Sequence, residues 1–545
     1  MTSVLPALSD QFGKPLPLGR YASGPSRDAG ALRGTIANWN PVRLANTEAE
    51  IRERGLIQRR AASLAANDWA AKAGIRTIAD NAVGTGLVPK SNIPHAIMGI
   101  DREAAAAIGE KMEWAWAVWS REAHARGIAH FEDLQFLGIS SILRLGEMLH
   151  LPVMLPVKDG RTFSLAIQDM NPARLATPAD KTTDLSIRDG IEATQYGQPS
   201  HYWIACPPPA LTPVDMGQLF SEAFVRRPAR LGHRPNVFHL FRIEEEEQTR
   251  GVSALSPGMK LFRNLNDALD SELFAQVIAA SFPVFIGLED GTANLPPEVR
   301  QAYGLGEKQE ESEREIEFAP GTVTFGKPNE KPQVLSNQRP SSNFNAFMKM
   351  ILRALASMLG VPYESLTKDF SDTNYSSMRA ALNEAWKLYL FYRRWFARLY
   401  TQPVWEMVIE EAYLRNFLGL ADDINALAAQ DFYEGRAYWC NATWTGPARG
   451  FIDPVKEVQA VILALESNLT TYGEAWAERG GDFADALPVM EEERLALQRL
   501  PALKTFAAAK FGQPGKDAPE SGQEEPEQEG KKSRAAEQGE KDHAA

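Results

Sequence analysis

The pattern of apolar and polar positions divides the chain into helical, strand-rich and unpatterned stretches. Apolar residues recur at helical spacing within several stretches, including 47–82 and 131–145. From about 148 to 241 the apolar runs become short and are interrupted by proline and glycine, which is typical of strands. Helical spacing returns near 256–282. The pattern as a whole predicts an α+β fold that is predominantly helical.

The first helical stretch contains a second helix start at Asn67-Asp68, because both side chains favour the N-cap position. This start would place Trp69, Ala73 and Thr77 on one face of the helix. Gly84 and the residues after it predict the end of the helix, since glycine adopts positive φ readily.

The clearest amphipathic helix is predicted at 341–359, where Gly360 and Pro362 end it. Its apolar face includes Phe344, Phe347, Ile351 and Leu355. A polar loop follows, and further helices are predicted at about 376–400, 402–417, 454–466 and 488–510. In another helix, capped by Asp101, the three tryptophans Trp114, Trp116 and Trp119 are expected in the core or at a subunit interface rather than in a ligand cage.

The two ends of the chain lack this periodicity. Residues 1–45 are rich in proline, glycine, serine and arginine, which predicts a mobile N-terminal arm. The stretch from 513 to 545 contains nine acidic and five basic residues and no aliphatic side chain larger than alanine. Such a segment buries too little surface to fold, so we expect a disordered acidic tail.

Composition narrows the class of protein. The 545 residues carry a formal net charge of −12, which argues against a protein that grips nucleic acid over its whole surface. Two cysteines, Cys206 and Cys440, cannot form a disulfide framework, and this usage favours a reducing compartment such as a bacterial cytoplasm. We expect no membrane partner, because no run of 18 apolar residues and no signal peptide is found.

Motifs for catalysis are incomplete. The stretch Gly321–Pro328 approaches a phosphate-binding loop, but Pro328 stands where a hydroxyl would hold Mg²⁺, so a turn after a strand is the better interpretation. His124 and His130 lack partners at metal-ligand spacing, and the acidic run Glu244–Glu247 is interpreted as a solvated face, as is the run at 307–317. We therefore predict no catalytic residue, no metal site and no cofactor.

Several longer phrases occur between about residues 45 and 500. They are Asn67–Ala70 running to Asp80–Leu87, Phe131–Gln135 with Arg144–Glu147, Arg250–Ser253, Pro320–Val323, Leu359–Leu366 with Asn374–Ala380, and Trp444–Pro447 with Ile452–Glu457. Together, and in this order, these phrases resemble the lambda family of bacteriophage portal proteins.

The resemblance implies a ring, usually a dodecamer, at one vertex of the phage capsid. Double-stranded DNA would enter and leave through its central tunnel. The partners implied are other copies of the chain, the terminase large subunit, major capsid and scaffold proteins, and head-completion or adaptor proteins. The protein would lie in the virion, after assembly in the host cytoplasm.

The family fold has wing, stem, clip and crown regions, which the resemblance carries onto this chain. The expected boundaries are 1–45 for the arm, 46–254 for the wing, 255–282 for the first stem helix, 283–338 for the clip, 339–361 for the second stem helix, 362–375 for a tunnel loop, 376–512 for a wing helix and crown, and 513–545 for the tail.

A DNA conduit needs few cationic contacts, because every Lys or Arg held on a phosphate adds affinity that would slow translocation. The tunnel-loop candidates are Lys368, Asn374, Tyr375, Ser377 and Arg379. The stem candidates are Lys260, Arg263, Lys349 and Arg353, and each of these cations could equally be an ordinary solvent or salt-bridge residue. Two other functions stay open, namely a non-portal structural component of the head and a DNA-packaging enzyme.

Overall fold

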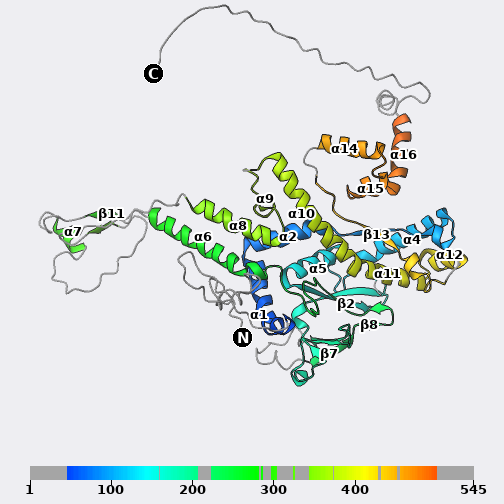
Figure 1. Cartoon of the computed structure of the whole chain (residues 1–545), viewed down its shortest axis with the longest axis horizontal. Coiled ribbons are helices and arrows are strands. Elements are labelled where there is room, and N and C mark those ends of the chain that lie inside the picture. The colour runs from blue at the N-terminus through cyan, green and yellow to red at the C-terminus, as the bar shows by residue number, and fades with distance from the viewer. Residues whose placement is uncertain are drawn as a thin grey trace, which may run out of the picture. The chain divides into compact units, whose positions relative to one another are not determined.

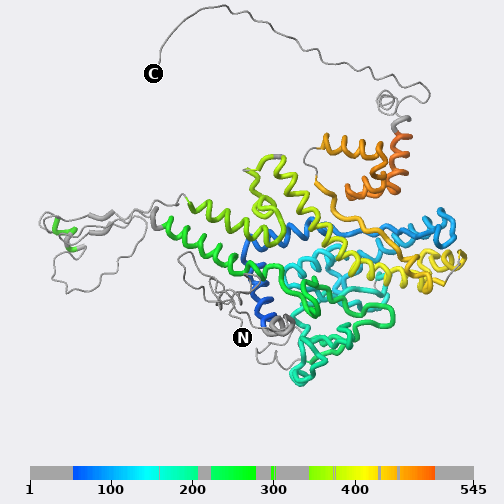
Figure 2. Tube along the Cα trace, in the orientation of Figure 1, coloured from blue at the N-terminus to red at the C-terminus, as the bar shows by residue number. Residues whose placement is uncertain are grey.

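The computed structural model describes residues 46–158, 160–206, 223–280, 284–286, 296–302, 323–325, 343–371, 373–427, 431–450 and 454–499. The chain forms two compact units, one up to Val458 and one from Gln459 onward (Figures 1 and 2). The predicted N-terminal arm, the acidic tail and most of the predicted clip lie outside the described residues.

The first unit begins with a layer of helices. They are α1 (Asn46–Asn67), α2 (Trp69–Ala82), α3 (His95–Met98), α4 (Arg102–Arg121) and α5 (Phe131–Leu145). Asp68 caps α2 as the sequence predicts, since its carboxylate accepts a hydrogen bond of 2.7 Å from the amide of Ala71. Trp69, Ala73 and Thr77 follow at four-residue spacing within α2, as predicted. Of this face Thr77 is buried and Trp69 is exposed, and Ile75 and Ile78 also contribute to the core.

The strands follow where the pattern predicts them and form two main antiparallel sheets. The three-stranded sheet has the order β10-β2-β3, with β2 (Glu147–Met154), β3 (Leu165–Met170) and β10 (Phe238–Phe241). The four-stranded sheet has the order β4-β5-β6-β7, with β4 (Ile187–Arg188), β5 (Ile191–Ala193), β6 (Pro199–Cys206) and β7 (Ala223–Pro228). Helix α5 packs on β2, and the 3-10 turns η3 (Pro172–Arg174) and η4 (Ala179–Lys181) connect the sheets along the chain.

Three two-stranded pairs complete the strands of the described residues. They are β8 (Arg230–Leu231) with β9 (Arg234–Pro235), β11 (Val284–Ile286) with β12 (Val323–Phe325), and β1 (Val88–Ser91) with β13 (Ala442–Thr445). The β11–β12 pair is parallel, and β12 lies within the stretch Gly321–Pro328 that approaches a phosphate-binding loop.

The rest of the first unit is helical. It contains η6 (Ser256–Gly258), α6 (Met259–Ala280), α7 (Pro297–Ala302), α8 (Phe344–Leu359), α9 (Tyr363–Thr367), α10 (Tyr375–Phe396), the π-helical turn η8 (Ala397–Thr401), α11 (Gln402–Leu414), η9 (Phe417–Gly419), α12 (Leu420–Leu427) and α13 (Arg436–Trp439). The predicted helices at 376–400 and 402–417 are one continuous run, because η8 joins α10 to α11 without a break.

Aromatic side chains fill the centre of this unit. Trp116 and Trp119 of α4 lie with ring centroids 5.0 Å apart, and Trp116 also contacts Phe131 and Trp405. All four side chains are buried. The core is therefore confirmed as the place of these two tryptophans, whereas Trp114 is exposed and its expected place at a subunit interface stays a prediction.

The second unit contains most of α14 (Pro454–Glu466), followed by α15 (Tyr472–Ala477) and α16 (Phe483–Arg499). The rings of Tyr472 and Phe483 stack at 5.2 Å, which holds α15 against α16. The predicted start of the last helix at residue 488 is wrong, since α16 begins five residues earlier and takes Pro488 within its length.

Candidate functional site

Helices α6 and α8 run side by side and form the hairpin that the sequence analysis assigns to the stem (Figure 1). Their proximal halves pack on the core: Phe262 and Leu265 of α6 and Ile351 and Leu355 of α8 are buried. Gly258 of η6, the turn before α6, packs closely against α8, because a Cβ at this position would lie 2.5 Å from the sulfur of Met358. The two helices are therefore fixed to each other at this end.

The distal halves of the same helices carry large apolar side chains that are exposed to solvent. They are Leu273, Phe274 and Val277 on α6 and Phe347 and Met350 on α8. Of the four packing residues expected on α8, Ile351 and Leu355 are therefore covered by the chain's own core, Phe344 is partly buried, and Phe347 is 45% exposed. Clustered exposed apolar side chains of this kind mark interaction surfaces.

The four cations expected on the stem have different surroundings. Lys260 and Arg263 of α6 are exposed, and Arg263 forms an i,i+4 ion pair with Asp267 at 3.8 Å. Arg353 of α8 lies over the ring of Tyr363 at 5.6 Å. Lys349 is partly buried and its charge helps to lower the pKa of Asp369, after the larger effect of the hydrogen bonds from Ser371.

The segment between α8 and α10 differs from the predicted polar loop at 362–375. Gly360 ends α8 with φ of 71°, as expected, but Pro362 then begins the one-turn helix α9 instead of a loop. Leu366 of α9 is buried, and Lys368 ends α9 in the left-handed region with φ of 59°. The irregular part is therefore shorter than predicted and runs from Lys368 to Asn374.

Four of the five residues expected in the tunnel loop, namely all except Arg379, have a structural role. Lys368 donates a hydrogen bond of 3.4 Å from Nζ to the hydroxyl of Thr77, and the side chain of Asn374 accepts one of 2.8 Å from the amide of Ser377. Tyr375 is the first residue of α10. Arg379, one turn further on, is exposed and forms no hydrogen bond or ion pair with a described residue. It is the most available cation of this set.

Helix α2 connects the hairpin to this segment. Asp68 caps α2 and also accepts a hydrogen bond of 2.8 Å from Asn266 of α6. Gly74 of α2 faces α8 and α9 so closely that a Cβ would lie 2.3 Å from Leu359 and 3.4 Å from Leu366. The base of α6, the end of α8 and α9 are thereby held on one helix.

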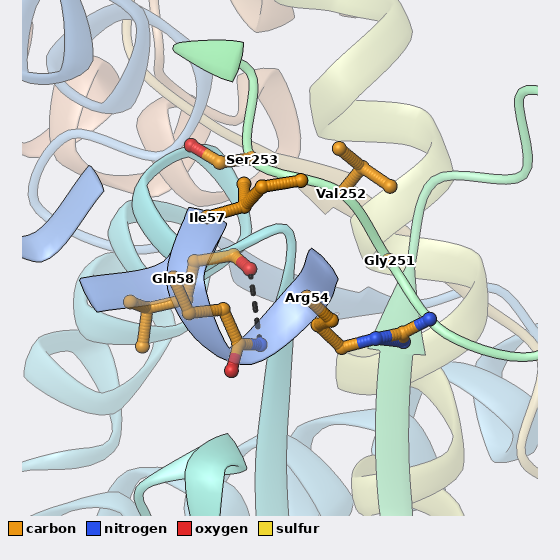
Figure 3. A pocket seen from close by; sticks show the side chains of 7 residues that line it. Arg54, Ile57, Gln58, Gly251, Val252 and Ser253 are labelled. Atoms are coloured by element: carbon orange, nitrogen blue, oxygen red, sulfur yellow. Dashed lines mark hydrogen bonds between the residues drawn. The ribbon is translucent and has the colours of Figure 1, made fainter. Parts of the chain in front are cut away.

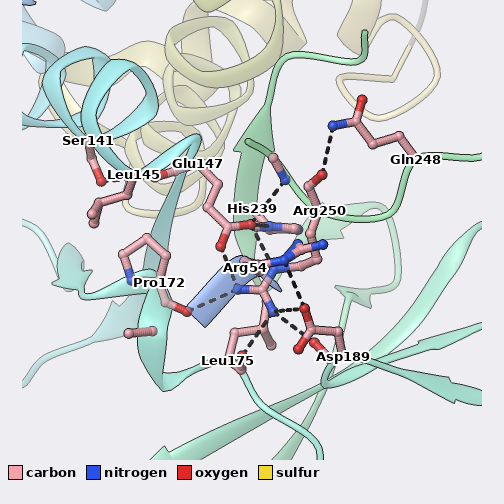
Figure 4. A network of polar contacts seen from close by, with 12 residues as sticks. Arg54, Ser141, Leu145, Glu147, Pro172, Leu175, Asp189, His239, Gln248 and Arg250 are labelled. Atoms are coloured by element: carbon pink, nitrogen blue, oxygen red, sulfur yellow. Dashed lines mark hydrogen bonds and ion pairs between the residues drawn. The ribbon is translucent and has the colours of Figure 1, made fainter. Parts of the chain in front are cut away.

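A buried ion-pair network fixes the segment that leads into α6 (Figure 4). Arg250 donates from Nε and Nη2 to both carboxylate oxygens of Glu147, at 2.7 and 2.5 Å, and His239 contacts the same carboxylate at 2.8 Å. Burial by itself raises the pKa of Glu147, but the charge and hydrogen bonds of Arg250, and then of His239, bring this pKa well below its usual range. Glu147 is therefore ionised inside the fold.

The network extends to α1 and to the four-stranded sheet. Arg54 of α1 pairs with Asp189 at 3.0 Å, and Gln58 donates to Glu147 at 3.0 Å. Beside Arg54 and Gln58 is a small cavity of about 10 Å³, lined also by Gly251 (Figure 3). This volume holds at most about one water molecule, so the cavity is a packing gap and not a ligand site.

The phrases that carry the family resemblance contact one another through buried polar side chains of this kind. Glu147 of the second phrase binds Arg250 of the third. Arg393 of α10 donates to the carbonyls of Asn81, in the first phrase, and Pro447, in the last, at 3.0 and 2.8 Å. Burial lowers the pKa of Arg393 to about 10, which leaves it charged at neutral pH. These phrases thus supply residues that hold different elements of the fold together. The sequence alone gives no signal for which residues pair, because the members of a pair lie up to several hundred positions apart.

No group of three or more His, Cys, Asp or Glu side chains that could hold a metal ion occurs within the part of the chain that the structure describes. His124 is buried and contacts Asp169 at 2.9 Å. No described helix is both long and apolar enough to cross a membrane.

Comparison with known proteins gives consistent matches. The profile of the family described as phage portal protein, lambda family, matches residues 33–393. The chain is 25% identical over 535 residues to the portal protein of Escherichia phage N15, covering 93% of this chain and 96% of that protein. It is 26% identical over 515 residues to portal protein B of Escherichia phage lambda, covering 90% and 92%.

A solved structure titled as the neck of a native GTA particle, computed with C12 symmetry, contains a similar chain. The match has a TM-score of 0.36 and 15% sequence identity, and it covers 78% of this chain and 94% of the other.

Proposed function

Because this chain belongs to the lambda family of phage portal proteins, we propose that its copies assemble into a ring through which double-stranded DNA is packaged and ejected. The observation that carries the proposal is the extent of the family match. It spans residues 33–393 and so includes α6, α8, α9 and most of α10. The relatives named as portal proteins cover at least 90% of the chain.

In this ring α6 and α8 act as the stem helices, and the irregular residues between α9 and α10 act as the tunnel loop. The exposed apolar side chains on the distal halves of α6 and α8 support this assignment, because a neighbouring copy would bury them. Such a head-to-tail contact closes into a ring when the rotation between copies is right. The expected dodecamer accounts for these surfaces without a further partner.

DNA contacts in the tunnel are proposed to be few and non-specific. Arg379 is the strongest candidate, since its guanidinium is exposed and unpaired among the described residues. Lys368 and Asn374 are weaker candidates, because hydrogen bonds within the chain already use their side chains. On the stem Lys260 is available, whereas Arg263 is shared with Asp267. Isolated cations of this kind centre a duplex without holding it.

The remaining partners belong to the same proposal. A terminase motor and then head-completion proteins would dock at the clip, residues 283–338, which lies largely outside the described residues. Capsid and scaffold proteins would surround the ring at its vertex in the virion. A non-portal head component would share this location but would not form a closed ring with a central hole.

The first experiment is mass photometry of the purified chain, with negative-stain class averages. A particle near 724 kDa, the mass of twelve copies of the 60.3-kDa chain, with a central hole is the expected result. Monomers or dimers at all concentrations, also in the presence of the scaffold protein, contradict the proposal.

The second experiment tests the tunnel loop through Tyr375→Ala combined with Arg379→Ala. Rings should form normally, but less DNA should be packaged per capsid. The matched control combines Tyr196→Ala with Arg398→Ala, which removes the same residue types at exposed positions elsewhere. Normal packaging by the first double variant refutes the tunnel-loop assignment but leaves the ring intact.

A further inference from the structure

The four-stranded sheet β4-β5-β6-β7 presents a different surface at each of its two outer strands. At the β7 end is an open cleft of about 700 Å³ between β2, the β8–β9 turn and α11. Its lining includes Val153, Met154, Arg227, Leu231, Met407 and Glu410. The volume lies within the range of about 300–1,000 Å³ that is usual for ligand pockets.

The charged side chains that line this cleft differ in whether they have a partner. Glu410 is buried and already paired, since Arg234 donates to it at 2.8 Å and His233 contacts it at 3.0 Å. Arg227 is different: its Nη1 atom is buried and has no hydrogen-bond partner in the described part of the chain. The cleft is therefore apolar with one cation left over, which fits an apolar group next to a carboxylate.

The backbone around the cleft disfavours an added strand. β10 pairs with β2 only from Glu147 to His150, so the far half of β2 has one open edge. Pro152 interrupts the row of amide donors on this half, and strand addition depends on such donors. An occupant of the cleft is thus recognised by its side chains.

The opposite outer strand, β4, follows a loop with complementary chemistry. Leu185 is 91% exposed, which is unusual for a leucine, and Asp184 precedes it. The amide and the hydroxyl of Ser186 donate to Oδ1 of Asp184 at 3.0 and 2.7 Å, so the loop is held in one conformation. These hydrogen bonds also lower the pKa of Asp184, which keeps the carboxylate charged at neutral pH.

From this complementarity we infer that Leu185 of one copy inserts into the β7-end cleft of the next copy, where the carboxylate of Asp184 meets Arg227. The inference rests on the ring proposed above and names one of its contacts. Because β4 and β7 are opposite outer strands of one sheet, the two surfaces point away from each other within a chain. They can meet only between copies, in a head-to-tail contact of the kind that closes into rings.

Cysteine cross-linking tests the contact. In a Cys206→Ser background, Leu185→Cys and Met154→Cys are combined, both at exposed positions that tolerate substitution. Assembled protein is oxidised and run on a denaturing gel without reductant, and a ladder of cross-linked multimers is expected. Each single-cysteine variant should give no ladder beyond dimers.

The matched control pairs Met154→Cys with Tyr196→Cys, because Tyr196 is 88% exposed and lies on the same sheet between β5 and β6. Rings that give no ladder with Leu185→Cys, or an equal ladder with Tyr196→Cys, overturn the contact and leave the portal ring standing. Absence of rings in mass photometry overturns both. A cross-link from Met154→Cys to another phage protein in infected cells, in place of Leu185→Cys, also overturns it.

A charge exchange provides a second test that needs no cross-link. Asp184→Arg or Arg227→Asp alone should raise the concentration at which half of the protein is in rings by about tenfold or more, since like charges then face each other. The double exchange should restore most of the assembly. Equal assembly in all variants contradicts the inferred pair.

Discussion

The ion pair between Glu147 and Arg250 allows a sharp prediction for Arg250→Met. Arg250 is 1% exposed, and methionine fills a similar volume without charge. The substitution leaves the carboxylate of Glu147 buried, with hydrogen bonds of 2.8 Å to His239, 3.0 Å from Gln58 and 3.4 Å from the amide of Gly251. It also removes the donors to the carbonyls of Leu175 and Asp189.

The expected loss follows from these contacts. Removing one partner of a buried ion pair costs about 3–5 kcal/mol in free energy of unfolding, because a charge remains buried without compensation. Each carbonyl that loses its donor adds about 1 kcal/mol, although such terms are not fully additive. We therefore expect a loss of at least about 4 kcal/mol out of the roughly 5–15 kcal/mol that is typical of folded proteins.

The assay is urea unfolding of the unassembled protein, followed by tryptophan fluorescence. With a urea m-value of about 3 kcal/mol per molar, the midpoint should fall by about 1.3 M. The matched control is Arg226→Met: Arg226 holds Glu192 with two hydrogen bonds of 2.9 and 2.7 Å, in the same bidentate geometry, but is 47% exposed. Exposed pairs contribute only about 0–1 kcal/mol, so its midpoint should barely move.

Equal midpoints for the two variants would refute the reasoning that burial makes the Glu147 pair essential. A double variant sharpens the test. Glu147→Gln combined with Arg250→Met removes both charges, so it should be more stable than the sum of the two single losses predicts. Strict additivity would show that the two charges do not depend on each other.

Three further predictions concern acid stability and packing. Burial lowers the pKa of His150 to about 4, so His150 takes up a proton in the unfolded state before it does so in the folded state as the pH falls. The free energy of unfolding should therefore decline by about 3 kcal/mol between about pH 6.5 and pH 4. In His150→Gln, urea midpoints measured across this range should fall less. Leu355→Ala should cost about 2–5 kcal/mol in thermal or urea unfolding, whereas Phe347→Ala should change unfolding little and weaken ring formation in mass photometry. Gly74→Ala should cost about 1–3 kcal/mol because the new methyl group overlaps Leu359, and an unchanged melting temperature would contradict this packing.

The sequence predicts those elements whose ends depend on residues close by in the chain. The amphipathic pattern before Gly360 predicts α8 to within a turn, and Asp68 predicts the start of α2. Both depend on residues within one or two turns. The predicted loop at 362–375 is wrong because part of it depends on a distant contact. Its residues favour turns, but residues 363–367 form the one-turn helix α9, which is stabilised where Leu366 packs beside Gly74 of α2.

Long-range partners lay beyond any sequence signal. The strand pair β1–β13 joins Val88 to Thr445. Residues 88–91 do not alternate between apolar and polar side chains, and residues 442–445 alternate over only four positions, which does not reveal the partner strand. Glu147 and Arg250 are 103 positions apart, and each alone is an ordinary charged residue. The tunnel candidates show the same limit, since only the fold reveals that Lys368 is bound to Thr77 while Arg379 is free among the described residues.

At the π-helical turn η8 the long helical run from α10 to α11 departs from regular α-helical hydrogen bonding. The amide of Gln402 donates to the carbonyl of Ala397, five residues back, and Pro403 next to it has no amide to donate. Beyond this turn α11 is clamped, because Trp405 is buried and its indole donates to the carbonyl of Cys440 at 3.0 Å. Wider turns and prolines are where helices bend.

The half of α10 next to η8 is held as well, because Tyr389 and Tyr392 are buried and Arg393 donates to the carbonyls of Asn81 and Pro447. Deflection is therefore left to the first half of α10, residues 375–384, which is about 15 Å long at 1.5 Å per residue, so a bend of about 10° displaces its first turn by about 3 Å. A displacement of that size is comparable to the reach of a side chain. The stiffness of this first half of α10 would thus set how far the segment beside it yields under load.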